Sequence, residues 1–311
     1  MDFSHYPVMF FECIEGLDIK PNGIYVDCTA GGGGHSEGIL KKLENGKLIS
    51  IDQDDNALLA CKNRFLPYGD KSILVKSNFS ELGHVLDELN IDHIDGVIMD
   101  LGVSSHQLDT PERGFSYNCD ANLDMRMNPL SPLSAYDVVN TYSEGELRRI
   151  ISEYGEEKFA HIIARNIVKE REIAPIKTTS ELVAVIKKSI PVGAARKEAQ
   201  HPAKRTFQAI RIEVNHELDV ITPAIDSAIS RLNAGGRIVI MTFHSLEDRI
   251  VKSSFNTYAQ GCICPKDFPI CVCGNKPKIK IINKKPITAS KEELEKNSRS
   301  KCAKLRIAEK L

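Results

Sequence analysis

Three acidic residues in the first third of the chain stand directly after short apolar runs, where strands would end. They are Asp27, Asp52 and Asp100. Four consecutive glycines, Gly31 to Gly34, separate Asp27 from the next helical pattern. The carboxyl ends of parallel strands meet at one edge of a sheet, and glycines let the backbone approach a ligand closely. This pattern predicts a site for a nucleotide-type cofactor, and the alternative is a connecting loop that binds nothing.

The spacing and charge of these acids indicate which cofactor it is. Asp52 lies 18 residues beyond Gly34, where a carboxylate accepts hydrogen bonds from both ribose hydroxyls of a nucleoside. Asp27 would repel a pyrophosphate at the glycine loop but would suit the amino group of an amino-acid moiety. S-adenosylmethionine has that amino group, a sulfonium and no phosphate, so the pattern favours it over NAD.

Asp100 is the best candidate for the chemical step of a methyl transfer. The sulfonium is already a good electrophile, so the site has to desolvate and align the nucleophile and accept its N–H. A nucleobase amine is a weak nucleophile because its lone pair is delocalised, and a carboxylate that accepts its N–H helps to localise that pair. No aromatic residue that would stack on a base occurs at 100–103. Phe115 and Phe243 both remain open as that aromatic wall.

The elements that must position these residues follow from apolar periodicity. Strands are predicted at 24–26, 47–51, 72–76 and 95–100, each followed by a loop or a helical pattern. Four such units predict a parallel, doubly wound α/β sheet with helices on both faces. Phe79 follows the third strand, where it would flank a bound base or belong to the core.

The middle of the chain is helical and lacks a clear strand. Helices are expected at 144–154, 157–170 and 179–188, with Ser143 and Thr178 as N-caps. A long helix at 210–232, a turn at 233–236 and a fifth strand at 237–241 then return the chain to the sheet.

Alternating segments at 278–282 and 303–308 are expected as edge strands. We therefore expect a first sheet part at 1–110, an inserted helical domain at 111–208 and a second sheet part at 209–311.

Composition excludes several classes of protein. No apolar run approaches 18 residues and no basic-then-apolar leader is present, which argues against a membrane span or a secretion signal. Nine cysteines without a leader favour a reducing cytoplasm over a disulfide scaffold. Residues 274–311 contain twelve Lys/Arg and four Asp/Glu, a net charge of +8, so the other 273 residues carry −9. This basic tail suggests a polyanionic partner, and a solvated lysine-rich surface is the alternative.

Two C-x-C pairs stand close together before the tail, at Cys262, Cys264, Cys271 and Cys273. Four thiolates at this spacing would suit zinc, although the pairs are shorter than a C-x2-C knuckle. A flexible cysteine-rich loop is the alternative.

Longer blocks of sequence resemble one family, the bacterial 16S ribosomal RNA (cytosine-N4) methyltransferases, known as RsmH or MraW. The resemblance extends from the N-terminus to about residue 253 and includes 305–309 near the end. The blocks are HYPV at 5–8, GGGHS at 32–36, DLGVSS at 100–105, RGFS at 113–116, LDMRM at 123–127, RTFQA at 205–209, RIEVN at 211–215 and FHSLEDR at 243–249.

The resemblance implies a class I S-adenosylmethionine-dependent methyltransferase fold, Rossmann-like, with a helical domain inserted after the fourth strand. The implied reaction methylates the exocyclic N4 of a cytidine in the decoding region of 16S rRNA, in the small ribosomal subunit. By motif, the implied cofactor contacts are Gly33, Gly34, His35, Asp52, Phe79, Asp100 and Gln107. Asp100 is the first catalytic candidate and His244 the second. The resemblance decides neither the zinc question nor whether the protein forms a homodimer.

Basic residues of the inserted domain and its flanks are candidates for rRNA phosphate contacts, together with the basic tail. They are Arg113, Arg126, Lys204, Arg205 and Arg211. The alternative for each of them is a structural salt bridge. A cytidine in folded RNA would have to turn outward to reach the pocket.

Three rival functions remain distinguishable. An NAD-dependent oxidoreductase would bind a dinucleotide, against which Asp27 and the additional glycines argue. A small-molecule methyltransferase would leave the helical insertion of about a hundred residues and the +8 tail unexplained. A non-enzymatic ribosome-binding factor would bind the cofactor without turnover, and the intact block 100–107 argues against it.

Overall fold

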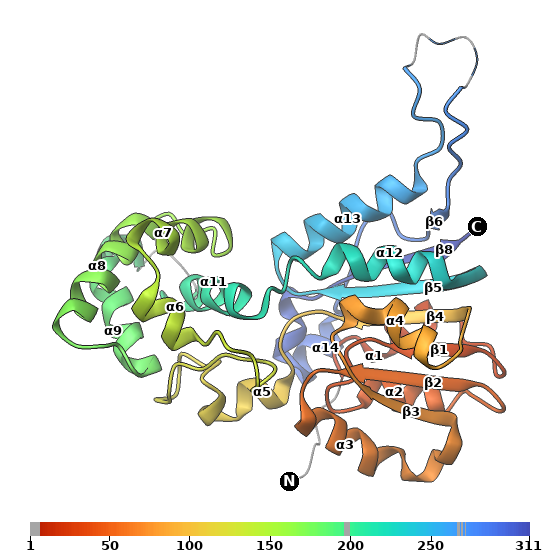
Figure 1. The fold of residues 1–311 in the computed structure, drawn as a ribbon, viewed down its shortest axis with the longest axis horizontal. Coiled ribbons are helices and arrows are strands. Elements are labelled where there is room, and N and C mark those ends of the chain that lie inside the picture. Colours follow the sequence, from red (N-terminus) through yellow and green to blue (C-terminus); the bar gives the residue numbers. More distant parts are fainter. Residues whose placement is uncertain (1–6, 196–199, 266–267, 269, 271) are drawn as a thin grey trace. The chain divides into compact units, whose positions relative to one another are not determined.

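The structure, a computed structural model, describes residues 7–195, 200–265, 268, 270 and 272–311 (Figure 1). It has two compact units: Met1–Gly102 with Leu218–Leu311, and Val103–Glu217. The insertion expected at 111–208 lies inside the second unit. The second unit is larger than the expected insertion: it begins at Val103 and ends at Glu217, because the whole of helices α5 (Ser105–Asp109) and α11 (Lys204–Asn215) belongs to it.

An eight-stranded sheet forms the centre of the first unit. Its order is β3-β2-β1-β4-β5-β8-β6, and β7 pairs with β8. The strands are β1 (Ile24–Asp27), β2 (Lys47–Asp52), β3 (Ser72–Lys76), β4 (Ile94–Asp100), β5 (Leu232–Thr242), β6 (Ile279–Ile281), β7 (Ile287–Thr288) and β8 (Lys304–Lys310). The pairs among β1 to β5 are parallel, and β8 is antiparallel to β5, β6 and β7. The predicted doubly wound sheet is confirmed.

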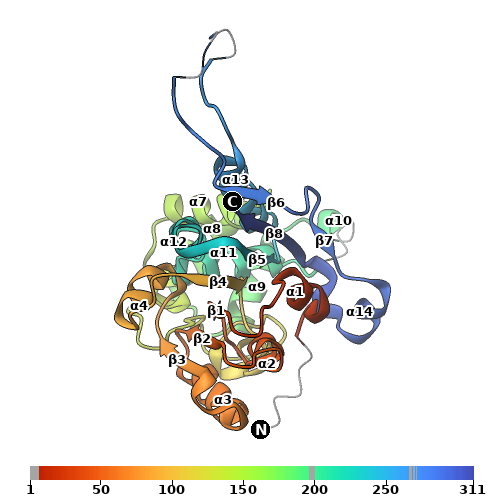
Figure 2. The same ribbon diagram turned by 90° about the vertical axis from the view of Figure 1, so that its right-hand side faces the viewer.

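Helices cover both faces of this sheet (Figure 2). Val97 and Met99 of β4 belong to the apolar cluster that contains α4, α12 and α13, whereas Ile98 belongs to the cluster with α1, α2 and α3. This alternation follows from the two-residue period of a strand, and both faces are apolar because both are covered. The helices are α1 (Phe10–Gly16), α2 (Gly34–Leu40), α3 (Asp55–Phe65), α4 (Leu82–Glu88), α12 (Ile221–Arg231), α13 (Ser245–Ala259) and α14 (Lys291–Lys296). Short 3-10 turns are η1 (Leu66–Lys71), η2 (Phe79–Glu81), η3 (Pro111–Arg113) and η4 (Ser298–Cys302).

The second unit is helical and has its own apolar core. Its further helices are α6 (Ala135–Thr141), α7 (Glu144–Glu153), α8 (Ala160–Ile173), α9 (Thr179–Ser189) and α10 (Val192–Ala195). Ser143 and Thr178 form capping boxes at the starts of α7 and α9, as predicted. Buried side chains from α7, α8, α9 and α11, among them Ile150, Ile163 and Ile186, form the core.

Two expectations about chain connectivity are wrong. The long helix expected at 210–232 is broken, because α11 ends at Asn215 and His216 adopts a left-handed conformation with φ 51°. The turn expected at 233–236 is part of β5, which begins at Leu232. Residues 233–236 form a bulge, because Ile94 pairs with Leu232 whereas Gly96 pairs with Arg237. Gly235 has a positive φ within this bulge.

The C-terminal strands differ in one respect from the expected edge pair. The segment expected at 303–308 forms β8, which lies inside the sheet between β5 and β6. The segment expected at 278–282 forms β6, which lies at the end of the strand order. Over the described ranges, no helix is long and apolar enough to cross a membrane.

Candidate active site

The glycine loop between β1 and α2 adopts backbone conformations, and approaches other residues so closely, that residues with side chains are disfavoured there. Gly31 and Gly33 have φ values of 50° and 77°, in the left-handed region. At Gly34, the first residue of α2, a Cβ would lie 2.2 Å from Pro7 Cγ. Three of the four glycines, Gly31, Gly33 and Gly34, therefore meet a conformational or a steric requirement.

Helix α3 holds the loop carbonyls in place. The Cys61 thiol donates to the Gly31 carbonyl oxygen at 3.4 Å, and Arg64 Nη1 donates to the Gly32 carbonyl oxygen at 2.5 Å. Arg64 also pairs with Glu37 of α2 at 3.0 Å. Because Cys61 and Arg64 are three residues apart, they share one face of the helix. The loop is thus fixed before any ligand binds.

Asp52 lies at the end of β2 with its carboxylate turned to the loop. Its Oδ2 accepts from the Gly31 N–H at 2.8 Å and its Oδ1 from the Asp54 N–H at 2.9 Å. Each oxygen keeps a further lone pair, so the two acceptors expected for ribose hydroxyls are still present. Burial raises the pKa of Asp52 to about 6. The ribose role remains a prediction, and this geometry supports it.

Phe79 begins η2, directly after β3, and is half-buried. It packs in part against the cluster that contains β1 and β2, so the core and ligand alternatives both keep support. Asn78 caps η2 by accepting from the Ser80 N–H, and its amide lies 3.4 Å from Gln53 Oε1. A flat ring and two amide groups therefore lie near the ends of β2 and β3.

Asp100 ends β4 and carries the most unusual carboxyl group of the site. Its Oδ1 is buried and has no hydrogen-bond partner in the described part of the chain. Its backbone N–H donates to Thr29 Oγ1 at 2.6 Å, which ties β4 to the loop. Burial raises the pKa of Asp100 well above its usual range, and the charges of Asp27 and Glu247 raise it further. Burial and these neighbouring charges therefore disfavour the ionised form of the carboxyl group until a cation or a donor reaches it.

His35 faces Asp100 from the first turn of α2. Its Nε2 lies 3.0 Å from the Val8 carbonyl oxygen, and its Nδ1 lies 3.9 Å from Asp100 Oδ2. Burial lowers the pKa of His35, so the ring is neutral near pH 7. Because a carbonyl can only accept, Nε2 carries the proton and Nδ1 presents its lone pair toward Asp100. His35 therefore orients the site without bringing a positive charge to it.

Asp27 serves the fold more directly than the sequence suggests. It is 2% exposed, and its oxygens accept from the Thr29 N–H at 3.0 Å and the Ser36 hydroxyl at 2.7 Å. The hydroxyls of Ser36 and Ser50 lie 2.9 Å apart beside it. A direct contact with an amino group, on which the cofactor choice partly rested, is therefore not favoured. Asp27 acts on the site through its charge.

His244 is a capping residue rather than an exposed acid or base. It is the N-cap of α13, and its Nδ1 accepts from the Glu247 N–H at 3.4 Å. Its Nε2 lies 3.0 Å from Glu247 Oε1, while Glu247 Oε2 accepts from the N–H groups of Phe243 and His244. The cap engages Nδ1, whereas the buried Nε2 lies close to the Glu247 carboxylate without a hydrogen bond in the described chain, so the catalytic role of His244 stays a prediction.

Gln107 lies in the second unit, at the third position of α5. Its Oε1 accepts from the Ser104 N–H at 3.0 Å, and its own N–H donates to the Ser104 hydroxyl. This capping box is a structural role for the side chain. Its predicted contact with the cofactor stays a prediction.

Four of the five candidate RNA-binding residues are engaged inside the second unit. Arg113 donates to two backbone carbonyls, and Arg126 pairs with Asp124 at 2.6 Å. Arg205 and Arg211 pair with Glu157 and Glu217 at 3.7 and 2.8 Å. The structural salt-bridge alternative therefore accounts for most of this set.

Lys204 differs from these arginines, since its side chain has no ion pair within the described ranges. It remains a candidate for a phosphate contact.

The cysteine pairs are partly described. The sulfur atoms of Cys262, Cys264 and Cys273 lie within 4.8 Å of one another, whereas Cys271 lies outside the described residues. The sequence prediction of a thiolate cluster is therefore supported for three of its four members.

Several residues that shape the site were not identified from sequence. They are Thr29, Cys61, Arg64 and Glu247. A signal existed for two of them. Thr29 lies between Asp27 and the glycines. Glu247 stands three residues after His244, the N-cap of α13, and this is the spacing of a capping box.

Residues 2–311 match the family model described as the MraW methylase family. The chain belongs to the MraW methylase family.

Relatives named ribosomal RNA small subunit methyltransferase H align over 100% of both chains. They come from Clostridium botulinum (strain Kyoto / Type A2), 58% identical, Clostridioides difficile (strain 630), 57% identical, and Finegoldia magna (strain ATCC 29328 / DSM 20472 / WAL 2508), 54% identical. Among solved structures, an rRNA methylase from Streptococcus thermophilus gives a TM-score of 0.44 at 12% identity over 100% of this chain and 99% of that chain.

The methyl donor of this methylase is S-adenosylmethionine, and the residues present fit it. Gly31 and Gly33 of the loop between β1 and α2 adopt left-handed backbone conformations that favour glycine, and Asp52 retains acceptor capacity for hydroxyls. The buried oxygen of Asp100 lacks a donor in the described chain, and Asp27 and Glu247 add negative charge. A ligand with an ammonium and a sulfonium brings positive charge to this acidic site.

The pKa of Asp52 predicts how cofactor binding depends on pH. The ionised carboxylate accepts from both hydroxyls, and protonation below about pH 6 removes acceptor capacity. In an Asp100→Asn background, where residue 100 cannot exchange a proton on binding, we expect the Kd for S-adenosylhomocysteine to be constant above pH 7 and to rise about tenfold at pH 5, as calorimetry would measure. Asp52→Asn in the same background should bind weakly at every pH and lose this dependence. Asp55→Asn, which removes an exposed carboxylate paired with Lys76, is the matched control. An affinity of the Asp100→Asn protein that is flat from pH 5 to 7 would contradict the assignment.

Proposed function

We propose that this methylase transfers a methyl group from S-adenosylmethionine to the exocyclic N4 of a cytidine in the decoding region of 16S rRNA. The observation that supports the proposal best is the partly exposed Asp100 carboxyl group, whose buried Oδ1 has no donor in the described chain. The names of the relatives support a small-subunit rRNA substrate. The sequence blocks at 100–105 and 123–127 support the cytidine N4. Such a substrate places the reaction in the cytoplasm.

The proposed cofactor contacts follow the strand ends in order. Gly33, Gly34 and His35 form the loop around the methionine part, and Asp52 accepts from the ribose hydroxyls. Phe79 flanks the adenine. Gln107 is kept as a further contact on the sequence resemblance alone.

Asp100 is proposed to act on both ligands. Its charge is unfavourable in the empty pocket, and the positive charge of the methyl donor stabilises the carboxylate. The bound S-adenosylmethionine supplies an electrophilic methyl group. The Asp100 side chain is 27% exposed, and its accessible oxygen would accept an N–H of the target amine, which localises the nitrogen lone pair and aligns it. The proton lost from the amine passes to Asp100 or to water as the N–C bond forms.

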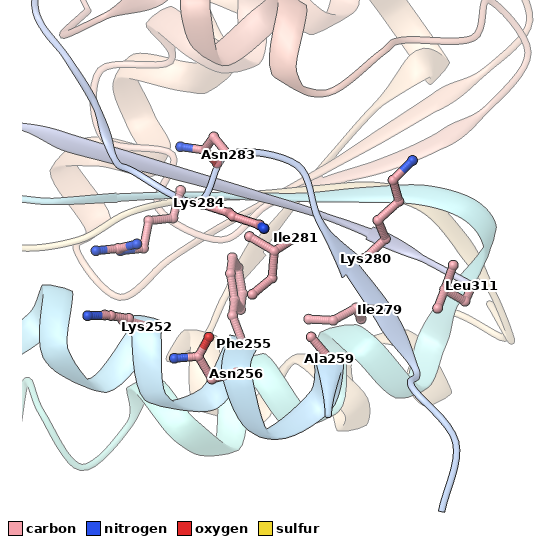
Figure 3. Close-up of a pocket in the computed structure, with 11 residues that line it drawn as sticks. Lys252, Phe255, Asn256, Ala259, Ile279, Lys280, Ile281, Asn283, Lys284 and Leu311 are labelled. Atoms are coloured by element: carbon pink, nitrogen blue, oxygen red, sulfur yellow. The ribbon is translucent and has the colours of Figure 1, made fainter. Parts of the chain in front are cut away.

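The RNA contact that the structure supports best involves the basic tail. A pocket of about 570 Å³ lies between α13 and β6 (Figure 3). Phe255, Ala259, Ile279 and Ile281 form its apolar side, and these side chains lie between the helix and the strand in Figure 3.

Lys252, Lys280 and Lys284 surround this apolar side, and no acidic side chain is among the described residues that line the pocket. None of the three lysines has an ion pair within the described chain. Positive charge around an apolar surface suits a single-stranded RNA segment, with phosphates on the lysines and a base against the apolar side. We propose this pocket as an rRNA contact of the first unit, and Lys204, separately, as a phosphate contact of the second unit.

The reaction is tested with small subunits that lack the modification and with radiolabelled S-adenosylmethionine at saturation. We expect the label to map to N4 of one cytidine. Asp100→Ala should lower the rate about a hundredfold or more, because the acceptor for the amine N–H is lost. Asp92→Asn, an exposed carboxylate on the segment before β4, should leave the rate unchanged. Cofactor binding without label on the subunits would contradict the proposal and favour the binding-factor alternative, and label on another atom would contradict cytidine N4.

The pocket is tested by the salt dependence of rRNA binding. Each phosphate contact contributes about 0.7 to the slope of log K against log salt for single-stranded RNA. The triple variant Lys252→Ala, Lys280→Ala, Lys284→Ala should therefore lower the slope by about two. A control with Lys42, Lys47 and Lys62 changed to Ala removes three exposed lysines elsewhere in the first unit and should leave the slope unchanged. Equal slopes for the wild type and the pocket variant would contradict this contact.

A further inference from the structure

The segment between α13 and β6 leaves the sheet as an arm and returns to it. In both views the two described sides of this arm, 260–265 and 272–278, run side by side (Figures 1 and 2). Asn275 Nδ2 donates to the carbonyl oxygens of Gln260 and Gly261 at 3.1 and 2.7 Å, and the Lys278 N–H donates to the Tyr258 carbonyl oxygen at 2.8 Å. These hydrogen bonds fix the base of the arm.

Beyond its base the arm has no apolar core among its described residues. Ile263 is 60% exposed and Val272 is 73% exposed, and each stands between or beside cysteines of the C-x-C pairs. A segment of this size that turns its apolar side chains to solvent cannot be held by hydrophobic burial. Small elements without a core commonly depend on a disulfide or a bound metal.

The cysteine sulfur atoms lie close to one another between the two sides of the arm, whereas the apolar side chains are exposed to solvent. The Sγ atoms of Cys262, Cys264 and Cys273 all lie within 4.8 Å of one another, and Cys262 Sγ lies 3.8 Å from Cys273 Sγ. A disulfide requires about 2.05 Å, so this pair is not cross-linked. With zinc–sulfur bonds of about 2.3 Å, two ligands of a tetrahedral ion lie about 3.8 Å apart, which matches the observed separation.

Backbone N–H groups also converge on these sulfurs. Cys273 Sγ accepts from the N–H groups of Ile263 and Asn275, each at 3.4 Å. Cys264 Sγ accepts from the Val272 N–H at 3.4 Å. Donors aimed at sulfur favour the thiolate over the thiol, and such outer contacts orient the ligands of a metal. This second feature is independent of the sulfur spacing.

We propose that the arm binds one zinc ion through the thiolates of Cys262, Cys264 and Cys273. Thiolates are soft ligands that select zinc over magnesium and calcium. On binding, each thiol releases its proton to solvent and its sulfur forms a bond to the metal. The ion links the outgoing side of the arm, with Cys262 and Cys264, to the returning side with Cys273. Its role is to hold the arm and thereby fix the position of the exposed side chains Ile263 and Val272.

The metal content of the purified full-length protein tests this proposal. After reconstitution with zinc under reducing conditions and gel filtration, we expect about one zinc per chain by mass spectrometry. Cobalt in place of zinc should give the intense near-ultraviolet band of thiolate-to-cobalt charge transfer. The double variant Cys262→Ser, Cys273→Ser should lose the zinc and the band, whereas Cys302→Ser, an exposed cysteine of η4, should keep both. Cys271 is left unchanged in all proteins.

Two controls separate metal binding from folding and from catalysis. Circular dichroism and S-adenosylhomocysteine binding should be unchanged in the double variant, because the sheet and the strand-end site do not depend on the arm. Absence of zinc from the reconstituted wild type, or equal zinc content in the wild type and the double variant, would overturn the proposal.

Discussion

One oxygen of the Asp100 carboxyl group, Oδ1, is withdrawn from water at the end of β4 and has no donor in the described chain, although the side chain as a whole is 27% exposed. Burying a carboxylate without a counter-ion is costly, so burial raises the pKa of Asp100 and disfavours its ionised form in the free protein. Asp27 and Glu247 increase that cost, and the neutral His35 does not offset it. A positively charged ligand removes the cost. The site is thus built with an unmet electrostatic requirement that selects a cation.

The rest of the first unit holds this arrangement in place. The hydroxyl of Thr29 accepts from the Asp100 N–H, and Asp27 accepts from the Thr29 N–H, so one short segment links β1, the loop and β4. On the other side, Arg64 and Cys61 fix the loop carbonyls. Because these contacts are already formed, the site does not have to reorganise when a ligand binds, which lowers the cost of binding.

The parallel sheet could be predicted from sequence because its signals are local. Apolar runs that end in Asp27, Asp52 and Asp100 mark the carboxyl ends of strands, and the glycines mark the loop. Side-chain partners could not be predicted, because they depend on distant parts of the chain. Arg211 resembles a phosphate-binding residue in the sequence, yet Glu217 occupies its guanidinium. His244 resembles a catalytic base, yet its position before α13 makes it a helix cap. The break at His216 was missed because the apolar period continues through it.

The most direct measurement is the number of protons released when S-adenosylmethionine binds at pH 7.5. Calorimetry in two buffers with different ionisation enthalpies gives this number. Asp52, with a pKa of about 6, is already ionised at this pH and contributes little. If the cation converts a neutral Asp100 to its carboxylate, the wild type should release up to one proton more than Asp100→Asn. Equal proton release by the two proteins would show that Asp100 does not change its ionisation when the ligand binds, and would contradict the account.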